Sequence, residues 1–433
     1  MHIRAFARVS TVNVALAALT AASASALHAQ SRTQNRPSHT SSVADHASDS
    51  LIAAVLADTL DLSAGSRVPT RRARQSVTIR PTMRSYSVGN IDAAEQGVYT
   101  SFVTRYPRAT IRLDVTPLTF RGDTSGVANR PQVSFGGMSP VSGRLDLRVR
   151  SADTLRVFAQ SGSSPGALSA QDAEALGAVG TSTIDLDAAS LGLAARVGTR
   201  YVLTQPLGAS GVSLSLRGGV EYDPKPSGTD VVSWRGTTVR GGVGVARAGL
   251  NTTLGTSVEV TQSYTDSLGG RNQFPGGGSL NVEARMLRLI GREGTSLVSL
   301  NAFYSRPLNI QRPNVRTRLI PIGDFMGATA SGAMPVGPLS LLPTVTVLRE
   351  SSLTQTSASG TTTRRDASGT TAVTALGLSI PLGRHLTVTP EGGVAFGSVG
   401  QTSTSTSVIR NQRQTFRDSI RGRYLTLEIS LRD

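Results

Sequence analysis

The sequence predicts an all-β fold: a single transmembrane antiparallel up-and-down β-barrel of about 14–16 strands, with the N- and C-termini on the periplasmic side. Three observations predict it. The first 29 residues have the layout of a secretory signal peptide. From residue 76 onward, apolar and polar residues alternate with a period of two. The connections between the alternating segments are short and long in rotation, as in barrels that cross a membrane.

The signal peptide is predicted over residues 1–29, with cleavage after Ala26 or Ala29. Arg4 and Arg8 precede an apolar segment, 12–22, that is too short to span a membrane as a helix. Residues 30–75 are rich in polar residues and predict a flexible periplasmic segment with a short helix over 45–60. Residues 76–433 are predicted to form the barrel.

Alternation is clearest in segment 212–222, where Val, Leu and Tyr share one face and Ser, Arg, Gly and Glu share the other. Segment 144–150 alternates in the same way and its phase returns at Leu155 and Val157, so residues 143–160 are predicted as one long strand. The sixteen predicted strands are 76–86, 98–106, 109–120, 131–138, 143–160, 184–198, 211–222, 233–247, 251–264, 278–290, 295–306, 326–334, 338–349, 370–382, 385–400 and 420–432.

The connections between these strands fall into two sets. The predicted short set is 107–108, 139–142, 248–250, 291–294, 335–337 and 383–384, with 199–210 as its one long member. The predicted long set is 87–97, 121–130, 161–183, 223–232, 265–277, 307–325, 350–369 and 401–419. A soluble secreted β-sandwich also alternates along its strands, but nothing in that fold sorts its turns in rotation. The sandwich is therefore the third-ranked interpretation.

Composition excludes several kinds of site. The chain has no cysteine, five histidines and a formal net charge of +16, and Lys225 is its only lysine. We expect no metal site, no cofactor and no catalytic residues, because the side chains that usually supply them are scarce. The protein is accordingly not expected to be an enzyme. The arginines are spread along the whole chain without a nucleic-acid-binding motif, so nucleic acid is not an expected partner.

This pattern resembles the Gram-negative-type outer-membrane β-barrels, and specifically the general (16-stranded) porins, over residues 76–432. In that family the loop after the fifth strand folds into the lumen and faces a wall of basic side chains. The resemblance implies that loop 161–183 narrows the lumen, with Asp172 and Glu174 as its acids. The corresponding basic wall would consist of Arg80, Arg84, Arg112, Arg144, Arg148, Arg150 and Arg156.

Arg217 and five acids also fall on the predicted inner face. The acids are Asp114, Asp146, Glu221, Glu259 and Glu283. Because Arg144 and Asp146 are two residues apart on a strand, their side chains share a face, as do those of Arg112 and Asp114. Two interpretations stay open: a mixed-charge lining that favours anions, or a structural network in which arginines and acids neutralise one another.

The sequence therefore predicts an outer-membrane channel for passive diffusion of small polar solutes, with a weak anion preference. The alternative is a barrel with a filled lumen that acts as an envelope-structural or surface-adhesion protein. Expected partners are outer-membrane lipid and the barrel-assembly machinery, and the sequence leaves association into a homo-oligomer open. Lipopolysaccharide is a further expected partner, because its phosphates suit the arginines predicted in the loops: Arg312, Arg316, Arg364, Arg365, Arg410 and Arg413.

Overall fold

The structure is a computed structural model that describes residues 74–89, 91–123, 133–138, 141–150, 153–161, 195–208, 211–222, 236–264, 278–290, 296–308, 324–358, 361–407 and 411–433. All of these residues belong to one compact unit, Ser42–Asp433. The predicted signal peptide, almost all of the predicted periplasmic segment and the helix predicted over 45–60 lie outside the described residues.

Eighteen strand segments form one sheet. The first nine are β1 (Arg74–Val88), β2 (Ile91–Arg105), β3 (Ala109–Val115), β4 (Pro117–Asp123), β5 (Val133–Met138), β6 (Ser142–Arg148), β7 (Thr154–Gln160), β8 (Arg196–Leu207) and β9 (Val212–Tyr222). The other nine are β10 (Thr237–Ala248), β11 (Thr252–Tyr264), β12 (Gly278–Ile290), β13 (Ser296–Leu308), β14 (Phe325–Val336), β15 (Leu339–Ala358), β16 (Thr361–Leu382), β17 (Leu386–Ser407) and β18 (Asn411–Arg432).

Two of the strands are interrupted, which reduces the eighteen segments to sixteen strands. Segments β3 and β4 both pair with β2, on either side of Thr116. Segments β3 and β4 therefore form one strand. On its other side β3 pairs with β6 and β4 pairs with β5, so β5 and β6 also form one strand. Sixteen strands is the upper end of the range that the sequence predicts.

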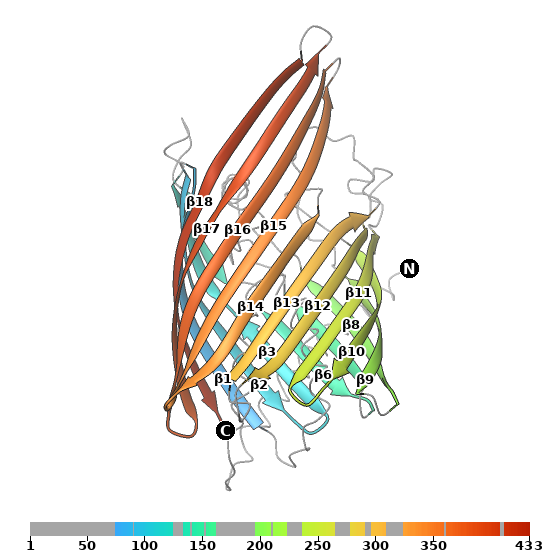
Figure 1. Cartoon of the computed structure of the whole chain (residues 1–433), viewed down its shortest axis with the longest axis vertical. Helices are drawn as coiled ribbons and strands as arrows, with labels where there is room; N and C mark the ends of the chain where they lie inside the picture. The colour runs from blue at the N-terminus through green and yellow to red at the C-terminus, as the bar shows by residue number, and fades with distance from the viewer. Residues whose placement is uncertain are drawn as a thin grey trace, which may run out of the picture. The chain divides into compact units, whose positions relative to one another are not determined.

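The sheet closes because its first and last strands pair antiparallel, from Ser76 opposite Arg432 to Val88 opposite Ile420. Figure 1 shows β1 and β18 side by side in the wall. The amide of Asp433 also donates a hydrogen bond to the carbonyl of Gln75, at 3.0 Å. An even number of antiparallel strands brings both ends of the barrel to one rim, here called the terminal rim; the opposite rim is the loop rim.

The two faces of the wall confirm a transmembrane barrel. Outward side chains are apolar and exposed, as with Leu425 (60% exposed) and Phe396 (54%), whereas inward side chains such as Ser215 (2%) are polar and buried. A soluble protein has the opposite arrangement, with apolar side chains inside. A barrel wall in hydrocarbon needs an apolar outer face and backbone hydrogen bonds that are all made within the sheet. The single closed sheet also excludes the two-sheet sandwich.

The prediction that residues 143–160 form one strand is wrong. It forms a hairpin in which β6 and β7 pair antiparallel, with Asp146 opposite Arg156. The chain turns between β6 and β7, where the amide of Val149 donates a hydrogen bond to the carbonyl of Asp153 at 3.0 Å. The predicted turn 139–142 falls between β5 and β6, which are segments of one strand, and the predicted loop 199–210 is mostly strand β8.

Three connections predicted to be long are hairpins instead. Strands β15 to β18 are 20–22 residues long, so segments 350–369 and 401–419 largely continue the strands. Likewise β1 ends at Val88 and β2 begins at Ile91, so most of the predicted loop 87–97 is strand. About 9–11 residues suffice to cross a membrane. These four strands therefore extend well beyond the wall, as the orange and red ribbons of Figure 1 show. Runs of Ser and Thr misled the prediction because they are common in loops, while Thr also favours strands.

Several short turns at the terminal rim agree with the prediction. Strands β14 and β15 are joined at 337–338 and strands β16 and β17 at 383–385. Gly337 and Gly383 have φ angles of 61° and 84°, which residues with a side chain rarely adopt. In the described part of the chain, no helix is long and apolar enough to span a membrane.

Candidate functional site: the inner face of the barrel

Charged side chains concentrate on the inner face of β1 to β12. Strand register and alternation place the following arginines there: Arg80, Arg84, Arg112, Arg144, Arg148, Arg156, Arg196, Arg200, Arg217, Arg240 and Arg285. The acids on the same face are Glu95, Asp114, Asp146, Glu221, Glu259 and Glu283. Arginines outnumber acids on this face, so the lining is basic.

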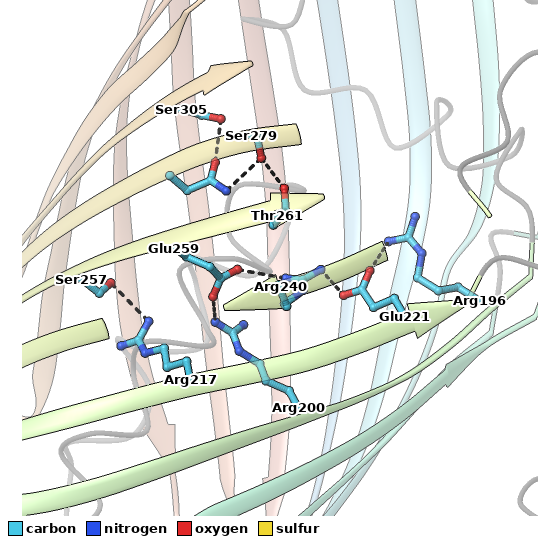
Figure 2. Close-up of polar contacts among 11 residues, drawn as sticks. Arg196, Arg200, Arg217, Glu221, Arg240, Ser257, Glu259, Thr261, Ser279 and Ser305 are labelled. Carbon is cyan, nitrogen blue, oxygen red and sulfur yellow. Dashed lines mark hydrogen bonds and ion pairs between the residues drawn. The ribbon is translucent and has the colours of Figure 1, made fainter. Parts of the chain in front are cut away.

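Four strands carry a chain of alternating charges (Figure 2). Arg196 on β8 lies 3.9 Å from Glu221 on β9, and Glu221 also pairs with Arg240 on β10. Arg240 continues to Glu259 on β11 at 3.4 Å, and Glu259 pairs with Arg200 on β8. Because each acid contacts two arginines, the chain ties β8 to β11 across the inner wall.

Inward glycines leave room for this chain. A Cβ atom at Gly219 would lie 2.8 Å from the carbonyl oxygen of Thr199 and 3.2 Å from Cγ of Arg240. At Gly242, a Cβ atom would lie 3.2 Å from Cβ of Glu259. The long side chains therefore lie flat against the wall over positions that have no side chain of their own.

A second cluster surrounds Asp146. Arg144 Nη2 and Arg156 Nε each lie 2.6 Å from an oxygen of this carboxylate, on β6 and β7. The Arg156 and Asp146 side chains are 9% and 10% exposed, so their charges are largely withdrawn from water. One carboxylate is thus shared by two arginines, and the three side chains together carry a net charge of +1.

A third cluster joins β1, β2 and β3. The Tyr99 hydroxyl donates a hydrogen bond to Asp114 at 2.7 Å, and Arg112 Nε lies 2.9 Å from the same carboxylate. The Arg80 guanidinium lies 5.0 Å from the centre of the Tyr99 ring, within the range of a cation–π contact. Arg84 lies 3.5 Å from Glu95, four residues nearer the loop rim than the Arg80–Tyr99 pair.

The inner face of β13 to β16 differs in character. Hydroxyl pairs occur there, such as Ser299 with Ser331 at 2.6 Å and Thr329 with Thr346 at 3.0 Å. Among the described inward side chains of these four strands, Glu350 alone is charged. The described lumen therefore has a charged side, mainly arginine, and a largely neutral hydroxyl-bearing side.

The predicted site residues are placed as follows. Arg80, Arg84, Arg112, Arg144, Arg148, Arg156, Arg217, Asp114, Asp146, Glu221, Glu259 and Glu283 lie on strands with inward register. Arg150 lies in the bend between β6 and β7 and is exposed at the terminal rim, because the predicted strand turns there. Asp172 and Glu174 lie outside the described residues.

Five charged residues of the inner face were not among the predicted site residues: Arg196, Arg200, Arg240, Arg285 and Glu95. Arg200 was assigned to a connection because strand β8 was predicted twelve residues too early at its start, over 184–198 instead of Arg196–Leu207. Glu95 was assigned to the predicted loop 87–97, but residues 91–97 belong to strand β2. Arg240 does lie on a predicted strand. Its signal in the sequence is the alternation with Thr238 and Gly242, which places all three on one face.

The closed sheet, its apolar outer surface and its charged inner surface define an outer-membrane β-barrel protein of the sixteen-stranded, porin-like type. Comparison with known proteins gives structural similarity only. No protein-family model matches the sequence, and no curated protein matches it.

The barrel is similar to solved outer-membrane proteins at low identity. A loop-deletion mutant of OmpT from Vibrio cholerae has a TM-score of 0.38 and 9% identity, covering 83% of this chain and 99% of that one. OmpT expressed in the outer membrane has a TM-score of 0.38 and 10% identity, covering 84% and 99%. OccK2 of Pseudomonas aeruginosa has a TM-score of 0.32 and 12% identity, covering 83% and 97%. The class therefore rests on this chain's own strand pairing and wall faces.

Proposed function

We propose that this protein is an outer-membrane channel for passive diffusion of small polar solutes, with a weak preference for anions. The observation that carries the proposal is the excess of arginine over acid on the inner face of β1 to β12. Barrels of sixteen strands are too wide for side chains to fill and leave an aqueous passage. Arginine-lined passages favour anions. The proposal assigns no covalent chemistry to the chain.

Two arginines are suited to set this preference. The polar contact of the Arg217 guanidinium is with the Ser257 hydroxyl at 3.2 Å, and among the described residues no carboxylate lies within ion-pair distance of it. Arg148, which is exposed near the terminal rim, also has no carboxylate within ion-pair distance among the described residues. Arg144 and Arg156, by contrast, are neutralised in part by Asp146. The uncompensated arginines contribute most to the potential that a passing ion experiences.

Loop 161–183 is proposed to narrow the passage, with Asp172 and Glu174 facing the basic wall. Two features support this part of the proposal. Strand β7 has only seven residues and ends at Gln160, and the next described strand begins at Arg196, so this connection is the longest between consecutive strands that the structure describes. The arginines of β6 to β8 lie on the strands directly beside it.

The envelope-structural alternative draws on one observation, the chain of charges that ties β8 to β11. Such a network stiffens the wall, and a wall that only needs stiffness does not need a passage. The two functions differ in conductance. A purified, folded barrel in a planar lipid bilayer passes current in discrete steps if the proposal is correct. A folded barrel that inserts and passes no current would contradict it.

The anion preference is tested by the reversal potential in a potassium chloride gradient. Replacing Arg148→Gln and Arg217→Gln together is expected to move the reversal potential toward that of a cation-preferring channel, because two uncompensated positive charges leave the lumen. Arg288→Gln is the matched control, because Arg288 is an exposed arginine on the outer face of β12. A reversal potential that is unchanged in the double variant would refute the proposal that Arg148 and Arg217 set the ion preference of the lumen. It would not affect the assignment of the fold.

A further inference from the structure

The outer face of β18 carries an arginine cluster that the channel function does not use. Arg417, Arg421 and Arg423 are exposed and point outward, because their inward neighbours Ile420 and Gly422 face the lumen. Outward positions of a transmembrane barrel normally carry apolar residues in the hydrocarbon region. Three outward arginines on one strand therefore need a polar environment at that height.

The arginines lie at the upper border of the apolar belt. The outward apolar residue of β18 nearest the terminal rim is Leu431, and Arg421 lies ten residues nearer the loop rim on the same strand. At roughly 3.4 Å per residue and a tilt of about 40°, ten residues rise by about 26 Å, which equals the height of the apolar band of such barrels. Exposed Met83 and Leu425 lie just below, in the last apolar row.

The neighbours of the cluster are hydroxyls. Arg423 Nε donates a hydrogen bond to the Ser85 hydroxyl at 3.3 Å, and Arg417 Nη2 donates one to the Ser398 hydroxyl at 3.4 Å. Among the described residues, no carboxylate lies within ion-pair distance of the three guanidinium groups. By register on this face, Asp92 lies two strands away from Arg421, and Asp366 lies two strands away from Thr415, two residues beyond Arg417. The positive charge of the cluster is thus available to a partner from outside.

Two other outward arginines either have a carboxylate partner or lie far from the upper border of the apolar belt. Arg306 on β13 lies 3.9 Å from Asp324, so its charge has a partner within the chain. Arg288 on β12 lies two residues before Ile290, where the strand ends near the terminal rim. The β18 cluster is therefore the described place where several uncompensated arginines meet the upper border of the belt.

We propose that Arg417, Arg421 and Arg423 bind the phosphate groups of a lipid head group in the outer leaflet, as in a phosphorylated glycolipid. The planar guanidinium forms paired, charge-assisted hydrogen bonds with phosphate oxygens. Phe396 and Leu425, which are both more than half exposed, lie beside and below the arginines and suit the acyl chains of the same lipid. The proposal is independent of whether the barrel conducts ions.

The test uses the purified full chain in detergent, with lipid binding counted by native mass spectrometry. The probes are lipid A that carries its phosphates and the same lipid after the phosphates are removed. Wild type is expected to bind the phosphorylated form at least about tenfold more tightly. The Arg421→Gln/Arg423→Gln variant is expected to lose most of this difference, whereas Arg288→Gln keeps it. Heat-modifiable migration on a gel confirms that each variant is folded.

Four results would overturn the proposal. The first is equal binding of the phosphorylated lipid by wild type and the double variant. The second is an equal loss in Arg288→Gln, which would indicate a general effect of positive charge. The third is displacement of the lipid by inorganic phosphate at the lipid's own concentration, which would indicate an anion site without a lipid component. Equal binding of the two lipid forms by wild type counts against the proposal in the same way as the first result.

Discussion

Asp146 and Arg156 face each other across β6 and β7, with Nε 2.6 Å from Oδ1 and both side chains about nine-tenths buried. Their pairing closes a hairpin in a segment whose alternation predicts one continuous strand. The same carboxylate accepts a hydrogen bond from Arg144 Nε at 2.7 Å. Asp146 therefore links the two strands of the hairpin and compensates part of the positive charge of Arg144 and Arg156.

Replacing Asp146→Asn is expected to lower the free energy of unfolding by about 1–3 kcal/mol, because the buried Arg156 guanidinium and the partly buried Arg144 guanidinium lose a charged acceptor. The measurement is urea-induced unfolding of the barrel in detergent micelles. Arg288→Gln, on the outer face, is expected to change stability by less than about 0.5 kcal/mol. The Asp146→Asn/Arg156→Gln double variant should recover part of the loss. Additive losses in the double variant would show that the two residues are not coupled.

Gly219→Val is expected to destabilise the barrel by about 1–3 kcal/mol, because the new side chain would meet the Thr199 carbonyl and displace Arg240 from its two acids. Gly218→Val is the matched control: Gly218 points outward, and a Cβ atom there meets nothing within 4 Å. Thermal unfolding followed by circular dichroism compares the two. Equal effects at the two positions would show that the space above Gly219 is not needed.

Thr371→Val is expected to stabilise the barrel by about 1 kcal/mol, because a buried hydroxyl without an acceptor or donor is replaced by a methyl group of similar size. Thr371 is 1% exposed, and its Oγ1 has no hydrogen-bond partner in the described structure. Thr82→Val should have the opposite sign, because Thr82 Oγ1 donates a hydrogen bond to Thr426 at 3.3 Å. Both are measured by urea-induced unfolding. A destabilised Thr371→Val variant would point to a buried water at this position.

Deleting residues 352–367 and joining Ser351 to Ser368 with a two-residue Asn-Gly turn is expected to leave barrel assembly intact. The shortened β15 and β16 would still run over Leu339–Ser351 and Ser368–Leu382, longer than the roughly 9–11 residues that a membrane crossing requires. Heat-modifiable migration measures the folded fraction. A deletion variant that does not fold would show that the extension of these strands contributes to assembly.

The sequence by itself determined the class of fold and the face on which each residue lies. Lipid on one side and water on the other force apolar and polar residues to alternate along each strand, so the two faces of segment 212–222 could be read from the order of its residues alone. The same constraint identified twelve inward charged residues without any knowledge of their neighbours. Strand ends were less certain, because Ser- and Thr-rich segments suit both loops and strands.

Only the tertiary structure decided which arginine meets which acid. Arg200 and Glu259 are 59 residues apart, yet they pair because three strand registers bring β8 and β11 into reach over Gly219 and Gly242. A single error in a strand boundary, such as the one in 143–160, removes such a pair from any sequence-based prediction. The pattern of faces is local to each strand, whereas the pattern of contacts is a property of the closed sheet.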